Sequence, residues 1–232
     1  MIEIAKHSAA LESLGLTTLD GVKRYSGTPV KTQGGKRDVF RIALPDVTLY
    51  LKRNWRPYKK DGLASLLRRG KVWSIAKCEW ENYRALQRAG LHTAELVAYG
   101  EDCGPLWERF SFIITEAAPG KPLSECLNGR HDALAREIRK MHDAGLFSPD
   151  LFTRHIFMDG DRYTLIDMAR LDDGPAARDL AALNVTAPLR FVSARERVHF
   201  LKVYGGRQLF RQIEERVQYL LKTRRKFADF SA

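Results

Sequence analysis

The chemistry of this chain is concentrated in one stretch and its continuation, Ser148-Pro149-Asp150-Leu151-Phe152-Thr153-Arg154-His155-Ile156-Phe157 and then Leu165-Ile166-Asp167. The apolar residues around these polar side chains predict two short strands, 156–158 and 163–168. Asp159-Gly160-Asp161 between the two strands is a turn signal. The stretch therefore predicts a β-hairpin, with one carboxylate before it and a second carboxylate on its second strand.

The stretch resembles the protein-kinase catalytic loop, which has a base Asp, a metal ligand five positions on, and then a hairpin and a second metal-binding Asp. This resemblance implies phosphoryl transfer, which needs a positioned acceptor hydroxyl and a metal that neutralises developing charge. Asp150 would accept or orient the hydroxyl proton, and Asp167 would bind Mg²⁺, which prefers carboxylate and phosphate oxygens. His155, five positions after Asp150, could ligate the metal or hydrogen-bond near it, although imidazole is a less usual Mg²⁺ ligand. An ordinary hairpin with turn carboxylates fits the same stretch.

A lysine and a glutamate earlier in the chain are predicted to pair. Residues 47–52 predict a strand that ends at Lys52, and residues 71–89 predict a helix. Glu79 lies on the apolar stripe of that helix, whereas Glu81 is turned about 200° away from it. A carboxylate on an inward face is costly unless it is paired, so Lys52 is the natural partner of Glu79. A solvated lysine and a glutamate at the helix margin are the alternatives.

A glycine-containing basic hairpin is a candidate for contact with phosphates. Segments 21–25 and 39–44 predict strands, and the segment between them, 26–37, contains Gly34 and Gly35 together with lysines and an arginine. Glycines let a backbone approach a phosphate closely. No G-x-G-x-x-G motif is present, so a plain flexible hairpin fits equally well.

A composition typical of a hinge follows the β-rich part of the chain. Residues 115–120 leave a predicted strand and break at Pro-Gly, so backbone groups at Glu116 could receive an adenine edge. We therefore expect a β-rich lobe over 1–116 and a helical lobe over 117–232. The helices predicted for the second lobe are 123–127, 132–142, 178–183, 194–204 and 208–226.

Composition and charge narrow the class of protein. The chain has 232 residues, of which 44% are hydrophobic and 29% charged, as in a globular protein. Its three cysteines have no C-x-x-C spacing, which argues against a disulfide framework or a zinc site and suits a reducing cytosol. No signal-peptide pattern and no run of about 18 apolar residues occurs. The net charge of +11 calls for a partner or another explanation such as solubility, and nucleic acid, anionic lipid and phosphorylated substrates are all candidates.

The order of these motifs resembles the lipopolysaccharide core kinases, the family that phosphorylates Kdo or heptose sugars of the inner core. The resemblance covers about residues 21 to 205. The matching pieces are Tyr50-Leu51-Lys52, Glu79-Trp80 with Leu86, Ala98-Tyr99-Gly100-Glu101, Ser111-Phe112-Ile113-Ile114-Thr115-Glu116, Met141-His142, Asp150-Leu151-Phe152 with His155, Leu165-Ile166-Asp167, and Arg178-Asp179-Leu180-Ala181-Ala182-Leu183.

The resemblance implies an α+β, two-lobed protein-kinase-like fold with a β-rich N-lobe and a helical C-lobe. It implies that Lys52 holds the ATP phosphates, that Glu79 orients Lys52, and that Asp150 is the base. It also implies that His155 and Asp167 form the metal side, because a histidine commonly stands in this family where protein kinases carry asparagine. Ser148-Pro149 departs from the usual His-Arg before the base, and Asp179 resembles a buried aspartate that braces the catalytic loop.

The function implied is ATP- and Mg²⁺-dependent phosphorylation of a sugar hydroxyl on a lipopolysaccharide-type glycolipid. The enzyme is expected in the cytoplasm, peripheral at the inner face of the cytoplasmic membrane. The basic runs 53–71 and 222–226 are expected to favour an anionic membrane surface, and no nucleic acid partner is expected. The alternatives are a kinase-like enzyme acting on protein or a soluble small molecule, and a catalytically inactive kinase-like binding module. No Ala-Pro-Glu motif follows Asp167 to seat a peptide.

Overall fold

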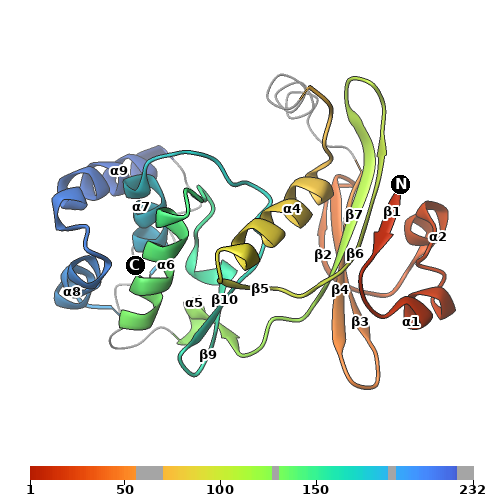
Figure 1. Ribbon diagram of the computed structural model, residues 1–232, viewed down its shortest axis with the longest axis horizontal. Helices are drawn as coiled ribbons and strands as arrows, with labels where there is room; N and C mark the ends of the chain where they lie inside the picture. The colour runs from red at the N-terminus through yellow and green to blue at the C-terminus, as the bar shows by residue number, and fades with distance from the viewer. Residues whose placement is uncertain (56–69, 127–130, 188–191, 224–232) are drawn as a thin grey trace. The chain divides into compact units, whose positions relative to one another are not determined.

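The computed structural model describes residues 1–55, 70–126, 131–187 and 192–223, which fall into two compact units (Figure 1). The first unit comprises Met1–Arg84 and Ala94–Ala117, and the second comprises Ala85–Thr93 and Ala118–Ala232. The first is built around a large sheet and the second is mainly helical. The predicted α+β class is therefore confirmed.

The first unit contains a six-stranded antiparallel sheet. Its order is β1 (Ile2–Ile4), β6 (Leu96–Cys103), β7 (Glu108–Glu116), β4 (Thr48–Asn54), β3 (Arg37–Ala43) and β2 (Thr28–Gln33). In the central strand β4, Leu49 and Leu51 are fully buried, whereas Tyr50 and Lys52 on the other face are partly exposed. The period-two pattern predicted for this strand is present, and it sets the direction in which Lys52 points.

Two short helices, α1 (Ser8–Ser13) and α2 (Leu19–Arg24), pack against the apolar face of this sheet. The strand predicted over 21–25 is wrong, because these residues form α2. Thr18 caps the helix by accepting the N–H of Gly21 at 3.0 Å. A Cβ on Gly21 would lie 1.8 Å from the carbonyl oxygen of Gly15, so no side chain fits there.

The long helix α4 (Ile75–Arg88) begins four residues later than the predicted helix 71–89. The Ser74 hydroxyl accepts the N–H three residues further along at 3.0 Å, and it thereby caps the helix. The buried Glu108 of β7 accepts the N–H of Ile75 at 2.9 Å. A carboxylate at a helix N-terminus interacts favourably with the helix dipole, so these contacts fix where α4 starts.

The second unit contains a four-stranded sheet in the order β5 (His92–Thr93), β10 (Arg162–Leu165), β9 (Ile156–Asp159) and β8 (Lys121–Pro122). Strands β9 and β10 pair antiparallel, so the predicted hairpin is confirmed, but β10 ends at Leu165 and Asp167 follows the second strand instead of lying on it as predicted. The helices are α5 (Leu123–Cys126), α6 (Asp132–Asp143), α7 (Ala176–Thr186), α8 (Ala194–Tyr204) and α9 (Phe210–Thr223). The predicted end of the last helix, beyond 223, lies outside the described residues.

Helix α7 is the most buried element of the second unit, with eight of its residues in the core. It packs against α9, and α6 packs against α8. A polar contact also joins α6 and α8: Nδ1 of the buried His142 on α6 lies 2.8 Å from the hydroxyl oxygen of Tyr204 on α8. The core therefore forms around α7, which also carries Asp179.

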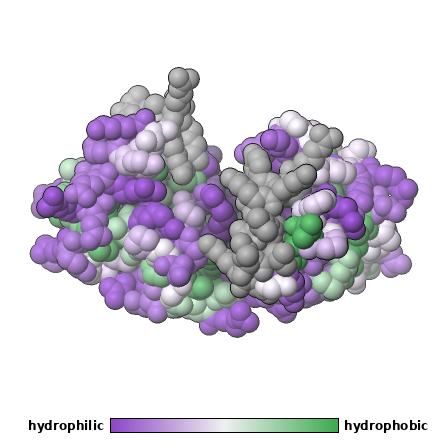
Figure 2. Space-filling view, turned by 90° about the horizontal axis from the view of Figure 1, so that it is seen from above, coloured by the Kyte–Doolittle hydropathy of each residue, from purple (hydrophilic) through white to green (hydrophobic). Residues whose placement is uncertain are grey.

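Two expectations about the whole chain can be compared with the described residues. Within the described residues, Cys78, Cys103 and Cys126 form no disulfide bond. No helix within the described ranges has both the length and the apolar character needed to cross a bilayer. On the face seen in Figure 2 hydrophilic side chains predominate, and the hydrophobic areas are small.

The Glu108 carboxyl gives the first unit a measurable pH dependence. Burial raises its pKa to about 6 from 4.5, against the opposing hydrogen bonds from Ser111 and Ile75. The folded state therefore binds more protons than the unfolded state between these values, and stability falls by about 2 kcal/mol as the pH rises through that window. Glu108→Gln should be less pH-sensitive there, measured by denaturant unfolding, and the exposed Glu12→Gln should match the wild type.

Equal pH slopes in Glu108→Gln and the wild type would mean that Glu108 titrates normally. The comparison uses the difference between variants, because other carboxylates titrate in the same range. Glutamine keeps an oxygen to accept the Ile75 N–H, so the start of α4 is retained in the variant.

Candidate active site

The predicted ion pair in the first unit is present. Lys52 Nζ lies 2.8 Å and 2.9 Å from the two carboxylate oxygens of Glu79. The Glu79 side chain is 2% exposed and the Lys52 side chain 17% exposed, so the pair is largely withdrawn from water. Strand β4 carries the lysine and helix α4 carries the glutamate. The two side chains face each other across these elements.

Tyr83, one turn after Glu79 on α4, was not identified from the sequence. Its hydroxyl donates to Glu79 Oε1 at 3.1 Å, and its ring is buried. The carboxylate thus accepts from both an ammonium and a phenol, which together satisfy much of its hydrogen-bonding capacity. The four-residue spacing of Glu79 and Tyr83 was the available signal, since such residues are neighbours on a helix.

The predicted phosphate and adenine contacts stay predictions. Gly34 and Gly35 form the turn between β2 and β3, with φ of +48° and +69°, values that favour glycine. The N–H of Glu116 donates to Glu95 O, and the N–H of Ala117 donates to Thr48 O. Because these two amides are already engaged, an adenine contact at Glu116 would have to use other groups.

In the second unit the loop that carries Asp150 is braced from α7. The fully buried Asp179 accepts the N–H of Ser148 through Oδ2 at 2.5 Å. Thr186, at the end of α7, accepts the N–H of Thr153 at 3.1 Å and receives its hydroxyl on the carbonyl oxygen at 2.7 Å. The loop is therefore fixed on both sides of Asp150. The Asp179 contact is the one the resemblance suggested, whereas Thr186 was not identified from the sequence.

Asp150 is held by an arginine that the sequence analysis did not identify. Arg170 donates through Nε to Asp150 Oδ2 at 2.7 Å and through Nη2 to Oδ1 at 2.6 Å. This geometry is the bidentate pairing that a guanidinium and a carboxylate favour. The Arg170 side chain is 66% exposed and that of Asp150 18% exposed. The candidate base thus has a fixed orientation and a positive neighbour.

His155 presents a neutral imidazole toward Asp167. Its Nδ1 lies 2.9 Å from the carbonyl oxygen of Asp150, which can only accept, so this nitrogen carries the proton. Burial lowers the pKa of His155, although the Asp167 charge opposes this effect. Nε2 keeps its lone pair, accepts from Arg154 at 3.1 Å and lies 3.6 Å from Asp167 Oδ2. With a neutral ring, this last contact is a juxtaposition of two potential ligands rather than an ion pair.

Asp167 has a backbone conformation that few residues other than glycine adopt. Its φ is +56°, in the left-handed region, directly after the hairpin. Such strain persists only where the surrounding structure imposes it, and it is often found at functional sites. The Asp167 side chain is 35% exposed, so its carboxylate can be reached by a ligand.

The donor set at Asp167 and His155 fits a metal that arrives with a phosphate ligand. Among the residues described, no group of three or more His, Cys, Asp or Glu side chains could hold a metal ion. Mg²⁺ is commonly bound by one or two carboxylates, with waters and substrate phosphates completing its shell. Asp167 would supply the carboxylate; His155 Nε2 lies beside it, but its lone pair accepts from Arg154 in this structure, so ligation by His155 would require Arg154 to move. The residues suit this arrangement and do not form a protein-only metal cage.

Comparison with known protein families identifies one family. The model of the lipopolysaccharide kinase (Kdo/WaaP) family matches residues 31–204. The lipopolysaccharide core heptose(I) kinase WaaP of Pseudomonas aeruginosa is 30% identical over 162 residues, which cover 58% of this chain and 60% of that protein. The chain thus spans about 60% of the length of this curated relative.

Solved structures share the fold at low sequence identity. A structure of WaaP in complex with acyl carrier protein has a TM-score of 0.67 at 22% identity, over 99% of this chain and 100% of that chain. The amicoumacin kinase hAmiN, in complex with AMP-PNP, Ca²⁺ and Ami, has a TM-score of 0.59 at 13% identity, over 84% and 80% of the two chains. The aminoglycoside phosphotransferase APH(4)-Ia has a TM-score of 0.54 at 13% identity, over 88% and 90%. The predicted protein-kinase-like fold is confirmed.

A double-mutant cycle should detect the coupling between Lys52 and Glu79. Lys52→Met leaves a buried carboxylate without its cation, so the free energy of unfolding should fall by up to about 3 kcal/mol. Glu79→Gln should also destabilise, and the double variant should lose at least about 0.5 kcal/mol less than the sum of the two single losses. The measurement is denaturant unfolding monitored by circular dichroism.

Glu81→Gln is the matched control on the same helix, because Glu81 is 31% exposed and lies 3.8 Å from Arg84. Its free energy of unfolding should stay within about 0.5 kcal/mol of wild type. Strictly additive losses at Lys52 and Glu79 would show that the pair contributes no coupling energy.

Proposed function

Because the chain belongs to the lipopolysaccharide kinase (Kdo/WaaP) family, we propose that it transfers the γ-phosphoryl group of ATP to a sugar hydroxyl of the lipopolysaccharide inner core, on Kdo or heptose. The observation that carries the proposal is the braced loop of the second unit. There Asp150 is oriented by Arg170 and lies in the same loop as His155, whose Nε2 lies beside Asp167. These are the groups that a base and a metal side require.

Each residue has a role that matches its surroundings. Asp150 would accept or orient the proton of the acceptor hydroxyl, because it is a carboxylate held at the surface of a rigid loop. Lys52 would hold the α- and β-phosphates, and Glu79 with Tyr83 would keep its ammonium oriented. Gly34 and Gly35 would let the β2–β3 turn approach phosphates, and the chain near Glu116 would receive the adenine.

Mg²⁺ would neutralise charge on the transferred phosphoryl group when it is bound. Asp167 would hold it through a carboxylate oxygen, with His155 beside it as a neutral nitrogen donor or hydrogen-bonding partner. Burial keeps His155 neutral, and the carbonyl oxygen of Asp150 fixes the orientation of its ring. Asp150 would therefore supply the base through its side chain and orient the metal-side histidine through its backbone.

We assign the nucleotide to the β-rich lobe, 1–116, and the base and metal residues to the helical lobe, 117–232, as parts of one kinase domain. The acceptor glycolipid is anchored in an anionic membrane, so the enzyme would work as a peripheral protein at the inner face of the cytoplasmic membrane. The net charge of +11 supports this, since basic residues near an anionic surface each contribute about 1 kcal/mol.

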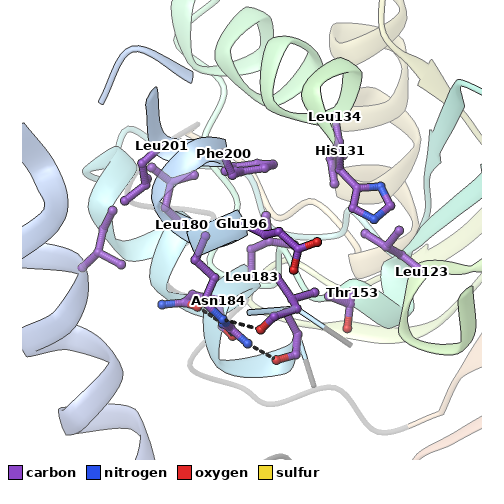
Figure 3. Close-up of a pocket in the computed structure, with 14 residues that line it drawn as sticks. Leu123, His131, Leu134, Thr153, Leu180, Leu183, Asn184, Glu196, Phe200 and Leu201 are labelled. Carbon is purple, nitrogen blue, oxygen red and sulfur yellow. Dashed lines mark hydrogen bonds between the residues drawn. The ribbon is translucent and has the colours of Figure 1, made fainter. Parts of the chain in front are cut away.

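An acyl carrier protein is a further proposed partner. A WaaP structure of the same fold is in complex with that protein. In the second unit of this chain, side chains of α6, α7 and α8 line an apolar cavity (Figure 3). Leu134, Leu180, Leu183, Phe200 and Leu201 line it together with the polar His131 and Glu196. Arg197, which also lines the cavity, donates to the side-chain oxygen of Asn184. Such a lining suits an acyl chain, which has no polar groups to satisfy.

The role of Asp150 is tested by Asp150→Asn. This variant should lower phosphoryl transfer by about 10²–10⁴-fold while Mg·ATP affinity changes little, because Asp150 would face the acceptor hydroxyl. The assay is phosphate incorporation into purified core glycolipid, with casein and soluble sugars as competing acceptors. Asp173→Asn in the following loop is the control. Near-normal turnover of Asp150→Asn would remove it as the base, and faster transfer to casein than to glycolipid would favour a protein kinase.

The cavity is tested by narrowing it. Leu183→Phe should weaken binding of acylated carrier protein by about tenfold or more and leave binding of the unacylated form unchanged, because only the acyl chain would enter the cavity. Val198→Phe, on an exposed position of α8, is the control. Binding is measured by calorimetry with both carrier forms. Equal affinity of wild-type protein for the two forms would contradict a cavity that accepts an acyl chain.

A further inference from the structure

The hairpin that joins β6 and β7 carries large apolar side chains at its tip. Figure 1 shows this hairpin projecting at one end of the six-stranded sheet. The tip is Gly104-Pro105-Leu106-Trp107, closed by a hydrogen bond from the Gly104 N–H to the Trp107 carbonyl at 2.9 Å. Leu106 is 55% exposed and Trp107 is 43% exposed. Neither side chain is needed by the site described above.

A third exposed apolar residue lies at the same end of the sheet. Met1 is 66% exposed, and its amino group donates to the carbonyl oxygen of Glu101, just before the tip. Glu101 in turn donates its N–H to the Met1 carbonyl, so the first residue of the chain is fastened to β6. Met1 thus lies beside Glu101, three positions before Gly104 along the chain.

Basic side chains, two of them paired with acids, lie beside the strands that lead to this tip. Arg109 is 58% exposed and pairs with Asp102 at 2.6 Å, and Lys23 lies 5.2 Å from the centre of the Phe110 ring. Lys77 lies 3.5 Å from Glu101 Oε1, on the strand that leads to the tip. The adjacent acid Glu108 is buried, and burial raises its pKa to about 6. The exposed cation next to the tip is therefore Arg109, which is paired with Asp102, whereas the Lys77 and Glu101 side chains are only 16% and 11% exposed.

The size of the apolar tip favours a lipid surface over a protein partner. A stable protein interface buries roughly 800 Å² on each side, whereas a tryptophan and a leucine at a hairpin tip offer only a fraction of that area. A bilayer interface accepts such a narrow tip, because an inserted side chain is surrounded by lipid on all sides. Tryptophan is enriched at this depth of a membrane, and flanking cations bind anionic headgroups.

We propose that the β6–β7 hairpin tip is a membrane anchor, with Leu106 and Trp107 inserted into an anionic lipid interface and Arg109 and Lys23 against the headgroups. This rests on the membrane part of the proposed function, which it makes specific. It requires nothing of the catalytic residues. Proline restricts the backbone at the tip, so the apolar side chains are presented without a large entropic cost of ordering the loop.

The test uses the whole protein with vesicles of phosphatidylcholine and phosphatidylglycerol. Leu106→Ser with Trp107→Ser should lower the vesicle affinity in co-sedimentation by about tenfold or more, because two inserted side chains lose their apolar contact. In the wild type, vesicles should shift tryptophan emission to the blue, and lipids brominated on the acyl chain should quench it. The Trp107→Phe protein should retain binding and lose most of that quenching.

Val30→Ser is the matched control, because Val30 is 54% exposed on the edge strand β2 of the same sheet. It should bind vesicles like the wild type, and melting temperatures should show that every variant is folded. Wild-type affinity in the Leu106/Trp107 double variant would overturn the anchor, as would absence of quenching in the wild type.

A soluble acceptor separates this proposal from the kinase assignment. The Leu106/Trp107 double variant should phosphorylate a deacylated core oligosaccharide at the wild-type rate and lose rate only on vesicle-embedded glycolipid. Activity of all variants on both acceptors would overturn the anchor and leave the kinase function standing. Absence of transfer to either acceptor by the wild type would instead contradict the proposed function.

Discussion

The buried carboxylate of Asp179 is the contact on which the organisation of the second unit depends. It is fully buried on the central helix α7, where an uncompensated charge would be very costly. Arg178 supplies the cation at 2.9 Å, and the Ser148 N–H and His142 Nε2 lie at 2.5 Å and 3.4 Å. A single side chain thus links α6, α7 and the loop that carries Asp150. The same buried side chain therefore stabilises the core around α7 and holds the loop that carries Asp150.

The first unit uses buried charge in a different way. Lys52 and Glu79 form a pair that replacement by apolar residues could match in stability, because desolvation offsets much of the attraction in a buried ion pair. The pair instead fixes the direction of an ammonium group on a rigid strand. Glu108 is the contrasting case: its partners include a helix N-terminus and a hydroxyl, and burial raises its pKa although the charge of Arg37 opposes this effect.

Much of this organisation could be predicted from the sequence, because its signals are local. Period-two alternation gave the direction of Lys52, helical spacing gave that of Glu79, and Asp-Gly between apolar runs gave the hairpin. The segment 21–25 was predicted wrongly as a strand, because the helix there depends on a Thr18 cap and on close approach of Gly21 to Gly15. The few apolar residues in so short a segment do not distinguish a strand from a helix.

The contacts that were not predicted are those that depend on tertiary structure. Arg170 stands in a loop, and no periodicity relates it to Asp150, twenty positions earlier. Thr186 is an ordinary helix-end threonine until the fold brings it to Thr153. Candidate catalytic residues could therefore be named from the sequence, whereas the residues that hold them in place required the structure.

The pairing of Arg170 with Asp150 is compatible with a role for Asp150 as a base. A carboxylate offers about four lone-pair sites, and a bidentate guanidinium occupies two of them, so an acceptor hydroxyl can still bind. The guanidinium is not deprotonated in proteins and does not compete for the hydroxyl proton. The Arg170 side chain is 66% exposed, so an acceptor that approaches Asp150 would come close to its charge. An acceptor bearing a negative group would gain from this charge, whereas a neutral sugar would gain only from the orientation of the base. Arg170 thus has two effects: it orients Asp150, and its positive charge favours an acceptor that carries a negative group.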